Sequence, residues 1–484
     1  MRLPTLIALL ALTGCPKTTP PQAAAQPAPA EAARTMPGPL ATPAFKMPTT
    51  ETRTLSNGLK VVVATNHEVP LFDLRLVLDV GDWTDPKGKD GLTEVTFDML
   101  NEGAGDLTAE QLSRKLKLLG SNLYTGANID SAYVGASGLV KNMGPTLDLW
   151  TTVLTQPTFP ADEWTVLQKR DIANVKVQKE EPNSIARQTA YRILYGDSYR
   201  GRYPTEASYQ AISPKDMTMF YHRWVGPENA VLFVGGDVTA DQIVPLLDKR
   251  IGSWDPDVTE AKPQADLKMS EGGTLYFVDK PGAAQSVLRV MLPVGTRQDA
   301  DFFPLLMANE ALGGEFTSRI NMNLREDKGY TYGARCFLGN WDGPGVWGCV
   351  TSVQTKVTVP ALEQLKKEIT DALSTRPIEP RELTYFQSME VNAFPANYET
   401  TGQILDEQAT IWRYGLPTDW AEQYLPHVQA VTVDEANQAL KDRIDPSKLV
   451  WVVVGDKKTV YDGLKTLGLK VVQLDRDGNV VQGG

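Results

Sequence analysis

The chain has 484 residues, of which 42% are hydrophobic and 22% are charged, as in a globular protein. This length is too great for one hydrophobic core and predicts two to four domains. The formal net charge of −11 argues against a nucleic-acid partner, because nucleic-acid-binding proteins favour a basic stripe.

The N-terminus has the pattern of a secretory signal over residues 1–15. Arg2 precedes an apolar run, Leu6 to Leu12, that is too short to span a bilayer. The residues that end this segment, Leu12-Thr13-Gly14-Cys15, resemble a bacterial lipobox, in which the cysteine becomes the lipidated first residue of the mature protein. An incidental cysteine after an ordinary signal peptide is the alternative.

Residues 16–50 are rich in Pro, Ala and Thr, which is typical of a disordered tether. The lipobox resemblance, with no acidic residue at Pro16, implies a lipid anchor in the cell envelope of a Gram-negative-type bacterium. The expected place is the outer membrane, facing the periplasm.

Strand and helix patterns follow the tether over residues 51–254. Alternating residues predict half-buried strands over 54–64 and 72–80. Apolar residues at helical spacing then predict a helix with Asp90 as its N-cap and Gly103 as its stop. A capping-box pattern predicts a second helix over 108–120, and two more strands are expected over 122–128 and 131–139.

Two segments of the chain recur in the same order. Residues 74–81 return as 288–295, and 227–237 return as 446–456, at offsets of 214 and 219 residues. We therefore infer a duplicated domain. A charged linker over 255–272 separates the first copy from a second copy over 273–480.

The second copy repeats the order of elements. Helices are expected near 302–312 and 317–327, followed by a hairpin around Asp342. The mixture predicts the α+β class, with two homologous domains that each have a largely antiparallel sheet and helices packed on it.

Two cysteines bracket the predicted hairpin. If its loop centres between Asp342 and Gly343, Cys336 and Cys349 are directly opposed across the two strands. An oxidising periplasm would allow a disulfide between them, and facing buried thiols are the alternative.

The helix that begins near Gly91 carries the most informative motif. Residues 91–103 resemble the inverted zinc motif of the pitrilysin/insulinase metallopeptidases, in which His-x-x-Glu-His holds the metal and the general base. On that pattern the metal ligands fall on Glu94 and Asp98, and the catalytic glutamate falls on Phe97. The family's third ligand corresponds to Asn174. None of the four residues can take its family role, so the chain is expected to bind no zinc of its own.

The resemblance covers residues 51–470 and includes a second motif. Residues 313–332 are similar to the family's second-domain signature, in which an arginine and a tyrosine help to bind peptide beside a zinc held elsewhere. These positions are Arg325 and Tyr332. In the family the two homologous domains pair into a clamp, and two-chain members such as mitochondrial processing peptidase divide the zinc and non-zinc roles between subunits.

The resemblance implies a zinc-less subunit of a periplasmic zinc metalloendopeptidase, with the zinc on a homologous partner chain and an extended peptide as substrate. A non-enzymatic peptide-binding or scaffold lipoprotein is the alternative. A third hypothesis is a hydrolase that uses Glu94, Asp98 and Asn174 as oxygen ligands for another metal, such as calcium or magnesium.

Overall fold

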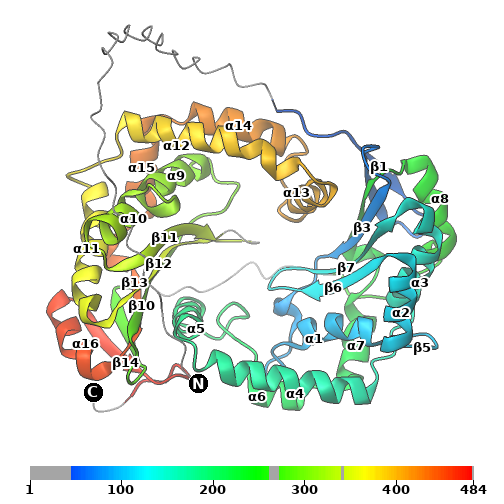
Figure 1. Ribbon diagram of the computed structural model, residues 1–484, viewed down its shortest axis with the longest axis horizontal. Coiled ribbons are helices and arrows are strands. Elements are labelled where there is room, and N and C mark those ends of the chain that lie inside the picture. Colours follow the sequence, from blue (N-terminus) through cyan, green and yellow to red (C-terminus); the bar gives the residue numbers. More distant parts are fainter. Residues whose placement is uncertain (1–44, 261–271, 340–342, 482–484) are drawn as a thin grey trace, which may run out of the picture. The chain divides into compact units, whose positions relative to one another are not determined.

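The computed structural model describes residues 45–260, 272–339 and 343–481. The predicted signal peptide, Cys15 and most of the predicted tether and linker lie outside these residues. Two six-stranded sheets of mostly antiparallel strands organise the described chain, and helices pack on both (Figure 1). The predicted α+β class is confirmed.

The first sheet has the strand order β1-β2-β8-β3-β7-β6. Apolar residues that alternate along β2 and β3 face a core shared with helices α1, α2, α3, α4, α7 and α8. The elements are β1 (Thr50–Thr54), β2 (Lys60–Thr65), β3 (Leu71–Leu78), α1 (Leu92–Asp98), β4 (Gly103–Ala104), β5 (Leu107–Thr108), α2 (Ala109–Leu119), β6 (Asn122–Ala127), β7 (Ala132–Leu139), α3 (Met143–Thr155), α4 (Ala161–Gln178), α5 (Pro182–Tyr195), α6 (Glu206–Ala211), α7 (Pro214–Trp224), β8 (Ala230–Gly236) and α8 (Ala240–Ile251).

The second sheet has the order β11-β12-β10-β13-β9-β14, and its core is built in the same way. Its elements are β9 (Thr274–Asp279), β10 (Gln285–Pro293), α9 (Phe302–Asn309), α10 (Arg319–Asn321), β11 (Thr331–Gly339), β12 (Val346–Gln354), α11 (Thr358–Ala372), α12 (Pro380–Ala393), α13 (Thr401–Arg413), α14 (Trp420–Ala430), α15 (Val433–Arg443), β13 (Val450–Gly455), α16 (Lys457–Leu464) and β14 (Lys470–Leu474).

The two sheets repeat one another strand by strand. In both, a parallel pair (β2 with β8, β9 with β13) is followed by three antiparallel strands in the same spatial order. The edge strand beyond the parallel pair differs, because β1 precedes β2 as a hairpin whereas β14 comes from the end of the chain. This correspondence agrees with the duplication inferred from the sequence offsets.

One helix from each half covers the sheet of the other half. Helix α5 packs on β10 and β13 through Ile185, Ala190 and Leu194 (Figure 1). Helix α13 packs on β8 of the first sheet through Ile404 and Leu405. The two helices are 219 residues apart, so they are duplicates that pack reciprocally.

Two local predictions were wrong. The predicted strand over 54–64 is a hairpin, in which β1 turns at residues 55–59 into β2; its apolar alternation begins only at Val61. The predicted N-cap Asp90 does not cap α1. Asp85 does so from five residues upstream, because its carboxylate accepts bonds from the Gly91 and Thr93 amides at 2.7 and 2.8 Å.

The packed chain also begins before residue 51. Phe45 stacks against Phe394 and Tyr398, with ring centroids 5.0 and 4.5 Å apart, and Met47 is buried beside α13. These contacts bury apolar side chains that the sequence places in a Pro- and Ala-rich stretch.

Candidate functional site

Helix α1 presents the residues of the degenerate zinc motif on two different faces. Phe97, at the position of the catalytic glutamate, is 0% exposed and belongs to the core of the first half. Glu94 and Asp98 lie one turn apart on the other face of the helix, away from that core. The general-base position is therefore filled by a core side chain, and the two metal positions carry carboxylates.

An arginine from α4 pairs with Asp98 and opposes the negative charge of both carboxylates. Arg170 Nη2 lies 3.3 Å from Asp98 Oδ2, and Arg170 Nε donates to Asp171 Oδ1 at 3.0 Å. Desolvation, together with the carboxylates of Asp98, Asp82 and Asp171, raises the pKa of Glu94 to about 7, and Arg170 opposes this shift. The positive charge beside the two motif carboxylates is thus a guanidinium of the same chain.

Asn174 does not join this group, because its side chain is exposed one turn further along α4. The buried Asp171 lies closer to Glu94 and contributes to its electrostatics. The family motif did not indicate Arg170 or Asp171, although both lie within about one helical turn of Asn174, the position that corresponds to the family's third ligand.

The donor set does not fit zinc, since it contains no imidazole and one of its carboxylates is ion-paired with arginine. No group of at least three Asp, Glu, His or Cys side chains among the described residues could hold a metal ion. The structure therefore gives no support to the hypothesis of a second metal held by Glu94, Asp98 and Asn174.

The residues of the second motif lie together in a groove of the second half. Arg325 and Tyr332 both line an open hollow of about 620 Å³ beside β11, the edge strand of the second sheet. Its other lining residues come from the N-terminus of α5, from β10, β11 and β12, from α10 and from the segment before α10: Asn183, Gln285, Gly314, Glu315, Phe316, Asn321, Thr331, Gly333, Ala334, Arg335, Val350, Thr351 and Ser352.

Both side chains are accessible to a ligand in the groove. Tyr332 is 90% exposed. The Arg325 guanidinium lies 4.5 Å from the centre of the Phe316 ring and pairs with the exposed Glu326 at 3.1 Å. Guanidinium and phenol groups can donate hydrogen bonds to a peptide carbonyl or to a developing oxyanion.

The hairpin beside this groove is fixed at its centre. Cys336 of β11 and Cys349 of β12 are directly opposed, and their sulfur atoms form a disulfide. Gly313, in the turn before α10, packs against this pair so closely that a Cβ atom there would lie 2.2 Å from Cys336 Sγ. A glycine at this position lets the turn approach the disulfide.

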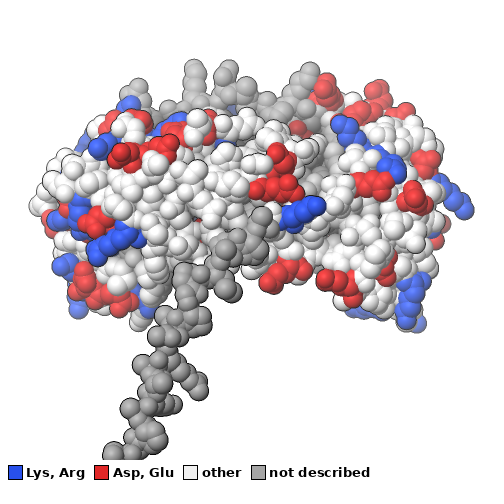
Figure 2. Space-filling view, turned by 90° about the horizontal axis from the view of Figure 1, so that it is seen from above, with Lys and Arg blue, Asp and Glu red and all other residues white. Residues whose placement is uncertain are grey.

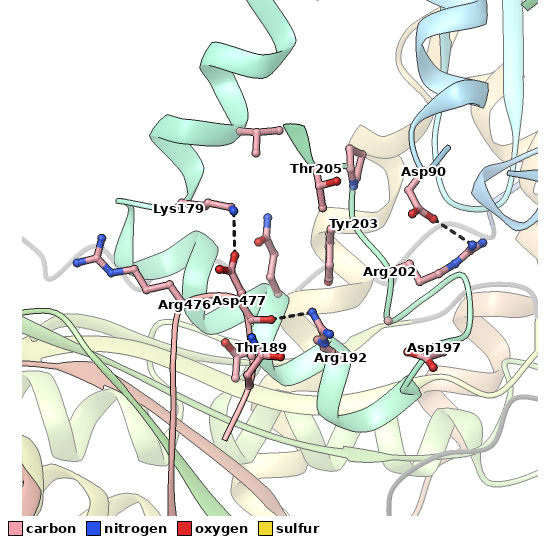
Figure 3. Close-up of a pocket in the computed structure, with 16 residues that line it drawn as sticks. Asp90, Lys179, Thr189, Arg192, Asp197, Arg202, Tyr203, Thr205, Arg476 and Asp477 are labelled. Carbon is pink, nitrogen blue, oxygen red and sulfur yellow. Dashed lines mark hydrogen bonds and ion pairs between the residues drawn. The ribbon is translucent and has the colours of Figure 1, made fainter. Parts of the chain in front are cut away.

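A second hollow, of about 320 Å³, lies between α4, α5 and the turn near residue 477 (Figure 3). Its charged side chains are paired with one another. Lys179 bonds Asp477 at 2.8 Å, Arg202 lies 3.1 Å from Asp90, and Arg192 donates to the Asp477 carbonyl at 2.7 Å. The two contacts with Asp477 attach the C-terminal turn to α4 and α5, which is a structural role.

Comparison with known families identifies the fold. Residues 211–388, which include the second motif, match the model described as "Peptidase M16 inactive domain". The chain is thus similar to the M16 peptidases. The resemblance to the pitrilysin/insulinase type of metallopeptidase predicted from the motifs is therefore confirmed.

Individual M16 relatives are distant but extend over most of the chain. An uncharacterized zinc protease, YmxG of Bacillus subtilis, is 22% identical over 66% of this chain and 77% of its own length. A protein named non-peptidase homolog YmxG, from Helicobacter pylori, is 20% identical over 82% of this chain and 92% of its own length.

Solved M16 structures share the fold. The peptidase M16 inactive domain from Pseudomonas fluorescens superposes with a TM-score of 0.77 at 22% identity, over 84% of this chain and 98% of that one. The periplasmic protease PqqL from Escherichia coli gives a TM-score of 0.72 at 19% identity, over 88% of this chain and 49% of PqqL.

Two surface properties complete the description. On the face shown in Figure 2, Lys and Arg side chains lie among Asp and Glu side chains, and the described residues of that face form no broad basic field. Among the described residues, no helix combines the length and the apolar character needed to cross a membrane.

Proposed function

We propose that this chain is the non-catalytic, zinc-less subunit of a periplasmic zinc metalloendopeptidase. A homologous partner chain supplies the zinc with its His and Glu ligands, and this chain supplies Arg325 and Tyr332 to bind the substrate. The observation that carries the proposal is an asymmetry: Arg325 and Tyr332 share an open groove, while Phe97 is core and Asp98 is ion-paired with Arg170.

The groove suits an extended peptide. Strand β11 is the edge of its sheet, so a peptide can add to it by backbone hydrogen bonds and be accepted with broad sequence tolerance. Tyr332 and Arg325 then stand where their donors can reach peptide carbonyl groups. This arrangement supports binding and orientation, and it leaves proton transfer and water activation to the partner's zinc site.

The names of the relatives support the same assignment. One relative is described as a non-peptidase homologue, and a fold neighbour is described as a periplasmic protease. The proposed location is the outer membrane of a Gram-negative-type envelope, facing the periplasm, with a lipid on Cys15. Metabolic labelling with a radioactive fatty acid tests the anchor, because Cys15→Ser should abolish incorporation.

Reconstitution tests the catalytic division of labour. Mixing the purified chain with a zinc-bearing homologue that retains His-x-x-Glu-His should produce chelator-sensitive peptide cleavage that neither chain shows alone. Arg325→Ala and Tyr332→Phe chains should restore much less activity, by about tenfold to a hundredfold, since each loses a donor to the reacting peptide.

The matched control is Arg381→Ala, which removes an exposed arginine of the same half that pairs with Glu379. It should restore full activity. Equal activity from the Arg325→Ala and Arg381→Ala chains would contradict the proposed role.

A second function uses the same groove without a zinc-bearing partner, because Arg325 and Tyr332 both line it and Tyr332 is 90% exposed. In this alternative the chain is a non-enzymatic lipoprotein of the envelope, and the groove binds peptides or a scaffold partner. Peptide capture by the pure chain, together with failure of every zinc-bearing homologue to gain activity from it, would favour this alternative.

A further inference from the structure

The duplication places two arginines at matching positions in the two sheets. Arg75 of β3 pairs in register with Phe233 of β8, and Arg289 of β10 pairs in register with Val452 of β13. Arg75 and Arg289 are 214 residues apart, and Phe233 and Val452 are 219 apart, which are the offsets of the duplication. The two guanidinium groups therefore occupy equivalent places on equivalent sheets.

In the first half the positive charge is neutralised within the chain. Asp406, from the helix α13 that covers this sheet, forms an ion pair with Arg75 Nη1. Arg75 Nε also donates to the Tyr124 hydroxyl at 3.5 Å, and the guanidinium lies 5.6 Å from the centre of that ring. The arginine and its carboxylate form a complete local pair.

In the second half, the covering helix α5 has a cation at the position where α13 has the carboxylate of Asp406. The residue of α5 that matches Asp406, at the same offset of 219, is Arg187. Burial lowers the pKa of the Arg289 guanidinium, and the Arg187 cation lowers it further, against the opposing influence of Tyr191. Two cations thus face one another where the first half has a cation and an anion.

Among the described residues, no carboxylate forms an ion pair with these arginines, and the one carboxylate that acts on them from a distance is Glu310, near Arg335. No ion pair within the described ranges involves Arg187, Arg289 or Arg335. Arg289 Nε has no hydrogen-bond partner there, and Arg289 Nη1 makes a long contact of 3.8 Å to the Met291 sulfur. The guanidinium also lies 5.9 Å from the centre of the Phe337 ring, but it has no anionic partner. A partly buried cation without an anion is costly, so this arrangement points to a ligand that supplies one.

The excess positive charge borders the peptide groove. Arg289, Val350 and Arg335 stand side by side in register across β10, β12 and β11, which puts them on one face of the sheet. Val350 and Arg335 line the groove. Asn183, one helical turn before Arg187 on α5, lines it as well, whereas Glu315 is the only carboxylate among the lining residues.

We propose that Arg187, Arg289 and Arg335 form an anion site that binds an acidic side chain of the peptide in the groove. The inference rests on the proposed peptide binding and adds a substrate class to it: extended peptides with Asp or Glu at the position that faces this site. Guanidinium groups bind carboxylates through paired hydrogen bonds. A strand added along β11 presents alternate side chains to the face that carries Arg335.

Two fluorescein-labelled peptides of equal length test the site, one with Glu at alternate positions and the other with Gln at those positions. Fluorescence anisotropy with the full chain should show tighter binding of the Glu peptide by about tenfold, and the ratio should shrink as salt is added. Arg335→Gln should reduce the ratio, since it removes one exposed cation at the rim of the groove.

Arg187→Asp is the sharper variant, because it gives Arg289 the partner that Arg75 already has. The ratio of affinities should fall to about one, and the melting temperature should rise as the like charges disappear. Arg381→Asp makes the same change of net charge outside the groove and should leave the ratio as it is.

The Gln peptide separates the two proposals. If it binds, and binding weakens in Tyr332→Ala, the groove binds peptides; a Glu-to-Gln affinity ratio near one would then overturn the anion site alone. Failure of both peptides to bind would overturn the anion site together with the peptide groove. An equal loss of the ratio in Arg187→Asp and Arg381→Asp would show a general charge effect and would also overturn the site.

Discussion

Arg170 and Asp98 form an ion pair, with 3.3 Å between Nη2 and Oδ2, at the helix position where M16 peptidases are expected to hold a zinc histidine. The same guanidinium bonds the buried Asp171. Where the family is expected to hold a metal ion, this chain has the guanidinium of Arg170. The positive charge at this place therefore comes from the folded chain itself.

Removing that cation should destabilise the first half. Arg170→Ala leaves Asp98 and Asp171 without a partner, and we expect the free energy of unfolding to fall by about 1 kcal/mol, because Arg170 is itself partly exposed. Urea denaturation measures this change. Lys176→Ala, on the same helix, removes only an exposed pair with Glu206 and should cost less. A larger loss in Lys176→Ala would contradict the importance of Arg170.

Zinc should have no effect on the purified chain. Because the donor set lacks imidazole and includes an ion-paired carboxylate, neither added zinc nor a chelator should change the melting temperature. A zinc-bearing homologue treated in parallel should lose stability with chelator. A chelator-induced drop in the melting temperature of this chain would show that it holds a metal after all.

The cap of α1 should be energetically important. Asp85→Ala removes the acceptor of the Gly91 and Thr93 amides and should lower the free energy of unfolding by about 2 kcal/mol. Asp90→Ala, at the position predicted from sequence, removes the pair with Arg202 but keeps both amides capped, so α1 should keep its N-terminal protection in this variant. Thermal and urea unfolding of the two variants distinguish the structural cap from the predicted one.

Stability should depend on pH through Asp82. Burial, together with the carboxylates of Asp85, Asp130 and Asp90, raises the pKa of its carboxyl from an ordinary 3.8 to about 7. The folded state therefore binds more protons than the unfolded state between these values, so the contribution of Asp82 to stability falls as pH rises through this range. Asp82→Asn should flatten the decline.

Urea unfolding at about pH 5 and about pH 7 measures that decline. The exposed Asp106 of the same half provides a control, since Asp106→Asn should leave the pH dependence as in the natural chain. If the stability of Asp82→Asn fell as steeply with rising pH as that of the natural chain, other carboxyl groups would be responsible for the pH dependence.

The glycine that approaches the disulfide should resist substitution. In Gly313→Ala the new methyl group would lie 2.2 Å from Cys336 Sγ and 2.7 Å from its Cβ, so the hairpin or the turn must shift. We expect a loss of about 2 kcal/mol. Gly144→Ala, where no atom lies within 4 Å, should instead stabilise α3 by about 0.5–1 kcal/mol.

Elements with strong local signals were predictable from sequence. The capping box at Thr108 begins α2, which ends before Gly120, and the strands near 122–128 and 131–139 form β6 and β7. Repeated apolar strands at two offsets revealed the duplication, because buried strands preserve their hydrophobic pattern. The opposed positions of Cys336 and Cys349 followed from the centre of the hairpin loop.

Features that depend on tertiary contact were not predictable. Asp85 caps α1 across a loop that brings it back over the helix, so a search for an adjacent N-cap selects Asp90 instead. Arg170 reaches Asp98 from 72 residues away, and no local pattern indicates that pairing. The contrast between Arg187 and Asp406 becomes meaningful only when the reciprocal packing of α5 and α13 is known.

That reciprocal packing makes the two copies mutually dependent. If either copy were produced alone, it would expose an apolar patch on its sheet, because the helix that covers this patch belongs to the other copy. Ancestral single-copy proteins of this kind would have had to associate in pairs, and gene fusion would then have preserved the exchange within one polypeptide.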